Sequence, residues 1–171
     1  EIIEAHYLFD MPYSQIEAVI HPQSVVHSMV QYVDGSTIAQ ASPPNMKGPI
    51  SLAINFPDRI KGATAAIDWS TSHTWTFAPI DAARFPAIDL ARRCGTLGGG
   101  LPAIFNAANE VCVAAFIAEK IGFTAIIETV EEVVQSLGSK SAGSPRDLAD
   151  VSAIENDARK IAQELLMKVA R

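Results

Sequence analysis

His21-Pro22-Gln23-Ser24-Val25-Val26-His27-Ser28-Met29-Val30 is the stretch of this chain on which the fold depends. It begins a run rich in β-branched residues that extends to Val33, and Asp34-Gly35 follows, a dipeptide that favours a type I′ turn. Ser36–Ala41 can return beside this run as a second strand. The pattern therefore predicts a β-hairpin.

The length of the turn fixes the register of the hairpin. A two-residue turn places Gln31 opposite Ile38 and His27 opposite Ser42. Side chains alternate along a strand, and both faces of this hairpin are mostly apolar. We therefore expect a sheet that is covered on both sides, with His27 on a packed surface near the base of the hairpin.

Composition and charge narrow the class of protein. The net charge of −6 gives no basic surface, so we expect no nucleic-acid partner. No apolar run reaches membrane-spanning length, and no signal peptide opens the chain. Cys94 and Cys112 have no CxxC spacing and are predicted to be buried thiols in a reducing compartment. The prediction is a soluble, cytoplasmic protein without a membrane partner.

The first nine residues, Glu1–Phe9, have the apolar spacing of a helix but no N-cap residue ahead of them. This pattern is typical of a segment that lies inside a longer polypeptide. We therefore expect the chain to be a piece of a longer one.

Helix signals dominate after residue 81. The pattern predicts helices over Pro86–Cys94, Pro102–Lys120 and Thr124–Leu137, a linker over Ser139–Pro145, and a last helix that begins at the capping box Ser152–Glu155. The predicted fold class is α+β: a partial domain with a hairpin-containing sheet, followed by a C-terminal four-helix bundle. The predicted domains are residues 1–57 and 82–171, with residues 58–81 connecting them.

Two groups of side chains could bind a metal, and each has a simpler alternative. His21 and His27 could be ligands, but zinc needs three or four, and the alternative is a histidine bonded to a neighbour such as Ser42. Glu1 and Glu4 lie at i, i+3 and could bind a hard divalent cation, whereas most such pairs are solvated.

Two further motifs favour structural roles. Gly98-Gly99-Gly100 lacks the spacing and the Lys-Ser/Thr of a phosphate loop, so we interpret it as a connector between helices. Asn106, Asn109 and Glu110 share one side of a helix and are interpreted as a polar stripe inside or beside the bundle, with a contact to another domain as the alternative.

The opening stretch, together with Asp34-Gly35-Ser36, Asn45-Met46 and Asn106–Glu110, resembles the 1-deoxy-D-xylulose 5-phosphate reductoisomerase family. The resemblance spans essentially the whole chain in order. Members of that family have an N-terminal NADPH-binding Rossmann domain, a central catalytic domain with a metal site and a C-terminal helical domain. The resemblance implies that this chain is the second half of the catalytic domain plus the helical domain.

The resemblance also implies roles for individual residues. Ile3-Glu4-Ala5 matches the sequence just after a metal-binding glutamate of the family, so Glu1 falls on the metal ligand and would also touch the substrate. Ser24 is implied to bind substrate, His27 to be catalytic, and Met46 to lie near the nicotinamide.

The activity implied is NADPH-dependent isomerisation and reduction of 1-deoxy-D-xylulose 5-phosphate to 2-C-methyl-D-erythritol 4-phosphate, in non-mevalonate isoprenoid synthesis. Mg²⁺ or Mn²⁺ would be the metal, the substrate a sugar phosphate, and the assembly a homodimer. The alternative is that these residues, as a separate chain, form an inactive structural and dimerisation module that lacks the NADPH domain.

Overall fold

The computed structural model describes residues 1–138 and 143–169 of the chain and contains helices and small sheets, as the α+β class predicts. The chain divides into two compact units. We call residues Glu1–Glu17 and Asp81–Arg171 the helical unit, and Ala18–Ile80 the hairpin unit. These are units of packing; the division into domains at residues 57 and 81 stays a prediction.

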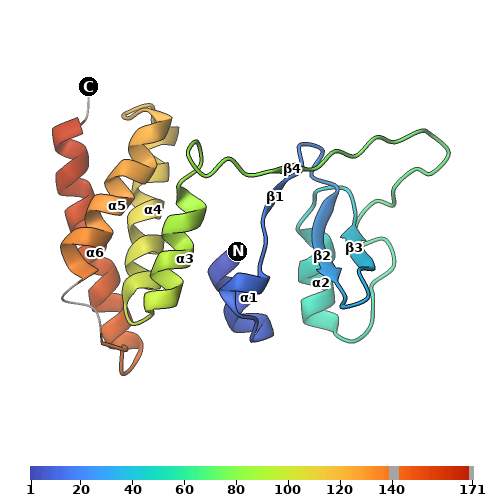
Figure 1. Ribbon diagram of the computed structural model, residues 1–171, viewed down its shortest axis with the longest axis horizontal. Coiled ribbons are helices and arrows are strands. Elements are labelled where there is room, and N and C mark those ends of the chain that lie inside the picture. The colour runs from blue at the N-terminus through green and yellow to red at the C-terminus, as the bar shows by residue number, and fades with distance from the viewer. Residues whose placement is uncertain (139–142, 170–171) are drawn as a thin grey trace. The chain divides into compact units, whose positions relative to one another are not determined.

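The described residues of the helical unit share one apolar core, and Figure 1 shows the helices that form it side by side. Side chains from four of its helices form this core, and Ile104 and Val133 are fully buried in it. The elements of the unit are α1 (Ile2–Phe9), a 3-10 turn η1 (Tyr13–Gln15), α3 (Ala87–Leu97), α4 (Leu101–Ile117), α5 (Phe123–Gly138) and α6 (Leu148–Val169). The core residues come from α3, α4, α5 and α6: Leu90, Cys94, Leu101, Ile104, Ala107, Ala108, Cys112, Val130, Val133, Val134, Leu137, Ala158, Ala162 and Leu166.

The helices lie where apolar periodicity predicts them, but several of the predicted ends are wrong. The helix α3 continues through Gly95 and ends before Gly98, whose φ of 67° suits glycine. Gly95 is required for packing, because a Cβ there would overlap the ring and hydroxyl of Tyr13. Glycine at this position therefore reflects a close approach and not a helix end.

The start of α6 also differs from the prediction. It lies ahead of the predicted capping box, because Asp147 Oδ1 accepts a hydrogen bond from the Asp150 N–H at 2.9 Å and so caps the helix earlier. The helix α5 likewise begins at Phe123 and ends at Gly138, one residue beyond the predicted range at each end. Within the predicted linker, residues 139–142 are outside the described residues.

The hairpin unit contains two antiparallel pairs of strands and one helix. β1 (Val19–Ile20) pairs with β4 (Ala78–Pro79), so the two ends of the unit meet. β2 (Val26–Gln31) pairs with β3 (Thr37–Ala41), and α2 (Lys47–Asn55) follows (Figure 1).

The predicted register of the hairpin is wrong by one residue. Gln31 pairs with Thr37, and the Gly35 N–H bonds the Tyr32 carbonyl at 3.0 Å, which makes a three-residue loop with Gly35 at φ 85°. The Asp34 carboxylate favours this turn, because Oδ1 accepts the Ser36 N–H at 2.9 Å and the Ser36 hydroxyl at 2.6 Å. These bonds also lower the pKa of Asp34. A side chain that bonds within the turn thus decides the loop length.

The predicted cover on both faces of the sheet is not found within residues 1–138 and 143–169. Ile38 is 63% exposed and Val30 is 55% exposed, on strands that carry no charged residue. The apolar side chains of β2 and β3 therefore remain available for contacts beyond this chain.

Both cysteines are free and buried, as predicted. Burial raises the pKa of the Cys112 thiol from its ordinary value of 9.0 to about 11. An unfolded thiol ionises first, so the contribution of Cys112 to stability is complete below pH 9 and is lost as the pH rises toward 11. We expect the free energy of unfolding to fall more steeply over this range in the wild type than in Cys112→Ala, measured by urea unfolding. Parallel pH profiles for the two proteins would contradict this expectation.

Candidate functional site

The opening motif forms a tight turn ahead of β2. The Ser24 N–H donates to the His21 carbonyl at 3.0 Å, and Ser24 adopts a φ of 49°, which is uncommon for a residue other than glycine. Such backbone conformations are found at functional sites, where surrounding contacts maintain them. Ser24 is exposed, and its hydroxyl makes no hydrogen bond within residues 1–138 and 143–169.

His21 fixes the start of this turn. Its Nδ1 lies 2.9 Å from the Thr76 carbonyl, which can only accept, and its Nε2 accepts the Val25 N–H at 3.1 Å. The ring is therefore the neutral tautomer with the proton on Nδ1, and it stacks on Phe77 with 4.5 Å between centroids. Both ring nitrogens are engaged, so His21 has no free lone pair for a metal.

Gln23 forms hydrogen bonds to the same residue, Thr76. Its Oε1 accepts the Thr76 N–H at 3.1 Å, and its Nε2 donates to the Thr76 hydroxyl at 3.0 Å. His21 and Gln23 together bond the backbone N–H, the carbonyl and the hydroxyl of Thr76. Thr76 is thus the anchor of the turn. No local pattern in residues 58–79 could have identified it.

His27 lies where the ladder between β2 and β3 is irregular. Val26 pairs with Ala41 and Ser28 with Gln40, so His27 is the extra residue of a bulge. Its Nε2 donates to the Ser42 carbonyl at 3.0 Å, which confirms the predicted partner. The predicted packed position is wrong, because the bulge leaves His27 exposed. No partner for His27 Nδ1 occurs in the described part of the chain, so this nitrogen can bond a ligand.

The loop that follows β3 ends at Met46. Asn45 Oδ1 accepts the Lys47 N–H at 2.9 Å and stabilises the first turn of α2. Met46 occupies the N-cap position of α2 and is 68% exposed. The side chain thus offers an apolar surface next to a helix start.

Glu1 belongs to the other unit. It is the N-cap residue of α1, its carbonyl accepts the Ala5 N–H at 2.8 Å, and its side chain is fully exposed. Mg²⁺ and Mn²⁺ prefer carboxylate oxygens as ligands, so the Glu1 side chain is of a type that can bind either ion. Residues 1–138 and 143–169 contain no group of three or more ligating side chains placed to hold an ion.

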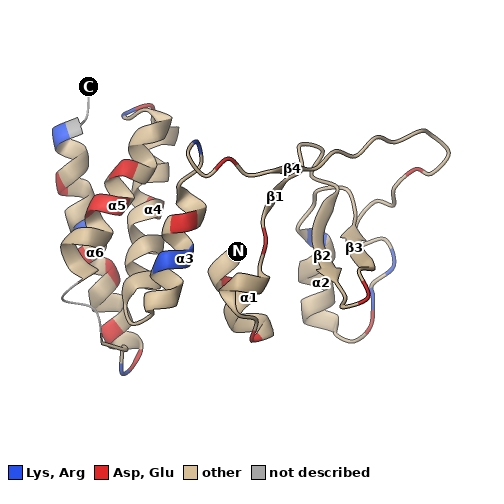
Figure 2. Ribbon diagram, viewed as in Figure 1, with Lys and Arg blue, Asp and Glu red and all other residues tan. Residues whose placement is uncertain are grey.

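Acidic and basic residues both occur on the helices of the helical unit (Figure 2), and several of them form ion pairs. Glu110 of α4 accepts from Arg159 of α6 at 2.9 Å, and Arg159 also contacts Glu155. This pairing within one unit supports the interpretation of Glu110 as part of a polar stripe between helices. The structural role of Gly98–Gly100 is likewise confirmed, since these residues join α3 to α4.

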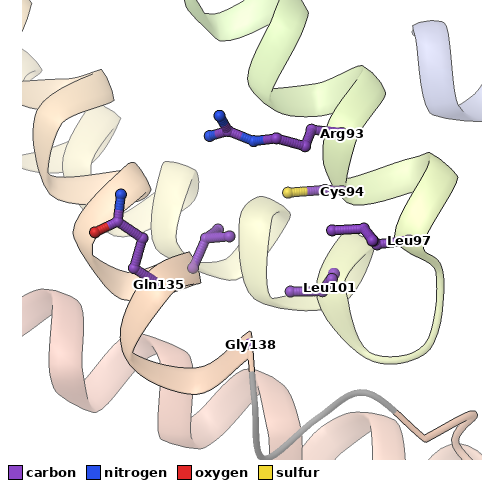
Figure 3. A pocket seen from close by; sticks show the side chains of 7 residues that line it. Arg93, Cys94, Leu97, Leu101, Gln135 and Gly138 are labelled. Atoms are coloured by element: carbon purple, nitrogen blue, oxygen red, sulfur yellow. The ribbon is translucent and has the colours of Figure 1, made fainter.

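A shallow hollow of about 450 Å³ opens between α3, α4 and α5 (Figure 3). Its one cationic side chain, Arg93, is already paired with Glu131 at 2.7 Å. The hollow is lined by Arg93, Cys94, Leu97, Leu101, Val134, Gln135 and Gly138. None of the residues that line this hollow was predicted to be functional. We therefore place the candidate site in the hairpin unit, at the turn that contains Ser24 and the bulge at His27. Glu1 is a separate candidate metal ligand.

None of the helices in the described residues is long and apolar enough to cross a membrane.

Comparison with known proteins identifies a family that this chain resembles. Residues 41–161 match the family model described as "DXP reductoisomerase C-terminal domain". The 1-deoxy-D-xylulose 5-phosphate reductoisomerase of Kitasatospora griseola is 53% identical over 96% of this chain and 43% of its own length. That of Streptomyces coelicolor is 49% identical over 99% of the chain and 41% of its own length. The chain therefore spans less than half the length of these relatives.

Solved structures with the same fold include enzyme complexes. The reductoisomerase from Zymomonas mobilis in complex with NADPH matches with a TM-score of 0.85 and 41% identity, over 96% of this chain and 43% of that one. A DOX-P reductoisomerase in complex with NADPH, fosmidomycin and magnesium matches with a TM-score of 0.88 and 38% identity, over 97% of this chain and 42% of that one.

Proposed function

This chain belongs to the 1-deoxy-D-xylulose 5-phosphate reductoisomerase family, and from that membership we propose that it supplies part of the catalytic domain and the C-terminal helical domain of such an enzyme. The proposed activity is NADPH-dependent isomerisation and reduction of 1-deoxy-D-xylulose 5-phosphate to 2-C-methyl-D-erythritol 4-phosphate. The observation that carries the proposal is 53% identity to a curated reductoisomerase along almost the whole chain.

Glu1 of the helical unit is the proposed metal ligand. Mg²⁺ or Mn²⁺, when bound, supplies a Lewis acid that polarises substrate oxygens and a template that orients them. Glu1 would contribute one carboxylate oxygen to that ion and would approach the substrate through it. The remaining ligands would come from outside these 171 residues, because the described residues offer no complete set.

The turn and the bulge of the hairpin unit are the proposed substrate-binding segments. The bond from His27 Nε2 to the Ser42 carbonyl orients the ring and leaves Nδ1 to hold or move a proton of the substrate. The Ser24 hydroxyl, presented by the turn that Thr76 anchors, would donate to a substrate oxygen. Met46 would give the nicotinamide ring an apolar contact.

The larger assembly follows from the same proposal. We place the domains at residues 1–57 and 82–171, with 58–81 between them, and propose that α3 to α6 form a four-helix bundle. The exposed apolar residues of β2 and β3 support a homodimer, or further strands of the catalytic domain, as their cover. The proposed location is the cytoplasm.

We expect the isolated 171-residue chain to be inactive, as a structural module. The polypeptide encoded by the full reading frame should oxidise NADPH only when substrate and Mg²⁺ are both present, followed by NADPH absorbance. The isolated chain should give no such oxidation. Oxidation by the isolated chain that disappears in Glu1→Gln would contradict its inactivity, and no oxidation by the full polypeptide would contradict the proposed function.

A further inference from the structure

An arginine of α3 binds the segment that follows α1. Arg92 is partly buried and donates from Nη1 to the Tyr13 carbonyl at 2.5 Å and from Nη2 to the Ile16 carbonyl. No carboxylate lies within ion-pairing distance of Arg92 in residues 1–138 and 143–169. The guanidinium therefore binds two backbone carbonyls, one at each end of η1. Its planar fork suits two acceptors, which the single nitrogen of lysine cannot reach together.

The neighbouring turn of α3 receives the Tyr13 ring. Gly95 lies one helical turn beyond Arg92, and the Tyr13 hydroxyl sits where a side chain at Gly95 would begin. Burial raises the pKa of this hydroxyl. Arg92 therefore holds the backbone of Tyr13 while Gly95 makes room for its ring.

Tyr13 in turn contacts α1 through His6. Its ring stacks on His6 with 4.3 Å between centroids and 23° between planes. His6 also bonds the Met11 carbonyl through Nδ1 at 2.7 Å, which fixes the chain as it leaves α1. A continuous series of contacts thus runs from Arg92 through Tyr13 and His6 into α1.

Within its unit, α1 packs on α3 and buries little of its own apolar surface. It has eight residues, below the length at which a helix is stable in water by itself. Ile2 is its one buried residue among those described, whereas Leu8 is 77% exposed and Phe9 is 73% exposed. The contacts with α3 therefore determine the orientation of α1 and the position of Glu1 at its start.

We propose that Arg92 is a positioning residue that holds α1, and with it Glu1, in the place from which Glu1 binds the metal. This inference rests on the proposed function, since it requires Glu1 to be a ligand. Arg92 itself touches no substrate atom or metal in this scheme and acts through Tyr13 and His6.

The test compares Arg92→Met and Arg92→Lys with Arg93→Met. Arg93 is the adjacent residue of α3, is 56% exposed, and makes a surface pair with Glu131, so it is a matched control. Amide exchange is measured by mass spectrometry on the folded chain. We expect exchange in residues 2–9 to be about tenfold faster in Arg92→Met, because hydrogen bonds from a charged donor are lost. Exchange in α4 to α6 should be unchanged, Arg92→Lys should lie between, and Arg93→Met should match the wild type.

The second measurement is the affinity for Mn²⁺ of the polypeptide encoded by the full reading frame, from the electron paramagnetic resonance signal of free Mn²⁺. We expect binding to be about tenfold weaker in Arg92→Met than in the wild type or in Arg93→Met. Faster exchange in α1 with unchanged Mn²⁺ affinity would overturn the positioning role alone, and unchanged exchange would overturn the contact series. A wild type that binds no Mn²⁺ would overturn the proposed role of Glu1 and this inference together.

Discussion

Replacement of Glu1 by glutamine should lower metal-dependent turnover by about 10²- to 10³-fold in the polypeptide encoded by the full reading frame. The carboxamide keeps the shape of the side chain but removes the negative charge that a hard divalent cation prefers. A loss of several kcal/mol of charge stabilisation corresponds to a rate change of this size. The measurement is NADPH oxidation at increasing Mg²⁺ concentration, and part of the lost rate should return at high Mg²⁺.

Glu4→Gln is the matched control for this variant. Glu4 lies on the same helix, three residues along, and its side chain is 67% exposed. We expect Glu4→Gln to retain the Mg²⁺ dependence of the wild type. Equal losses in the two variants would contradict the assignment of Glu1 as the ligand and would point to both carboxylates at the start of α1.

Ile104→Ala should give the largest loss of stability, about 2–5 kcal/mol in the free energy of unfolding. Ile104 of α4 is completely buried in the core that α3 to α6 share, so its truncation leaves a cavity in addition to the lost burial. Urea unfolding followed by far-ultraviolet circular dichroism measures this quantity, because most of the helical residues lie in the helical unit.

Ile117→Ala tests the same chemical change at the end of the same helix. Ile117 is 74% exposed, so we expect its truncation to change the free energy of unfolding by less than about 1 kcal/mol. Both tryptophans of the chain lie in the hairpin unit, so their fluorescence reports on that unit separately. Equal effects of the two substitutions would show that the core does not depend on Ile104.

The helices could be predicted from sequence because each carries a periodic apolar face, and that pattern is local. Their ends could not, because tertiary contacts decide them. In the sequence Gly95 is typical of a helix end. In the structure the helix continues through Gly95, and the Tyr13 ring occupies the space beside it. The turn of the hairpin shows the same limit, since Asp34-Gly35 favours a two-residue loop until the bonds from Ser36 to Asp34 select three residues.

The candidate site was predictable in part. The pairing of His27 with Ser42 follows from two strands of similar length, but the bulge that exposes the ring has no sequence signal. Thr76 and Arg92 were missed because their partners are 53 or more residues away in the chain. The roles of Glu1, Ser24, His27 and Met46 remain predictions drawn from the family resemblance.

The bond between Arg92 and the Ile16 carbonyl also constrains the order of events during synthesis. The two residues are 76 positions apart, and the whole hairpin unit lies between them. At about 5–20 residues per second, a ribosome needs roughly 4–15 s to deliver Arg92 after Ile16. During that interval α1 cannot dock on α3, so Ile2, which is buried in the folded unit, is still accessible to chaperones.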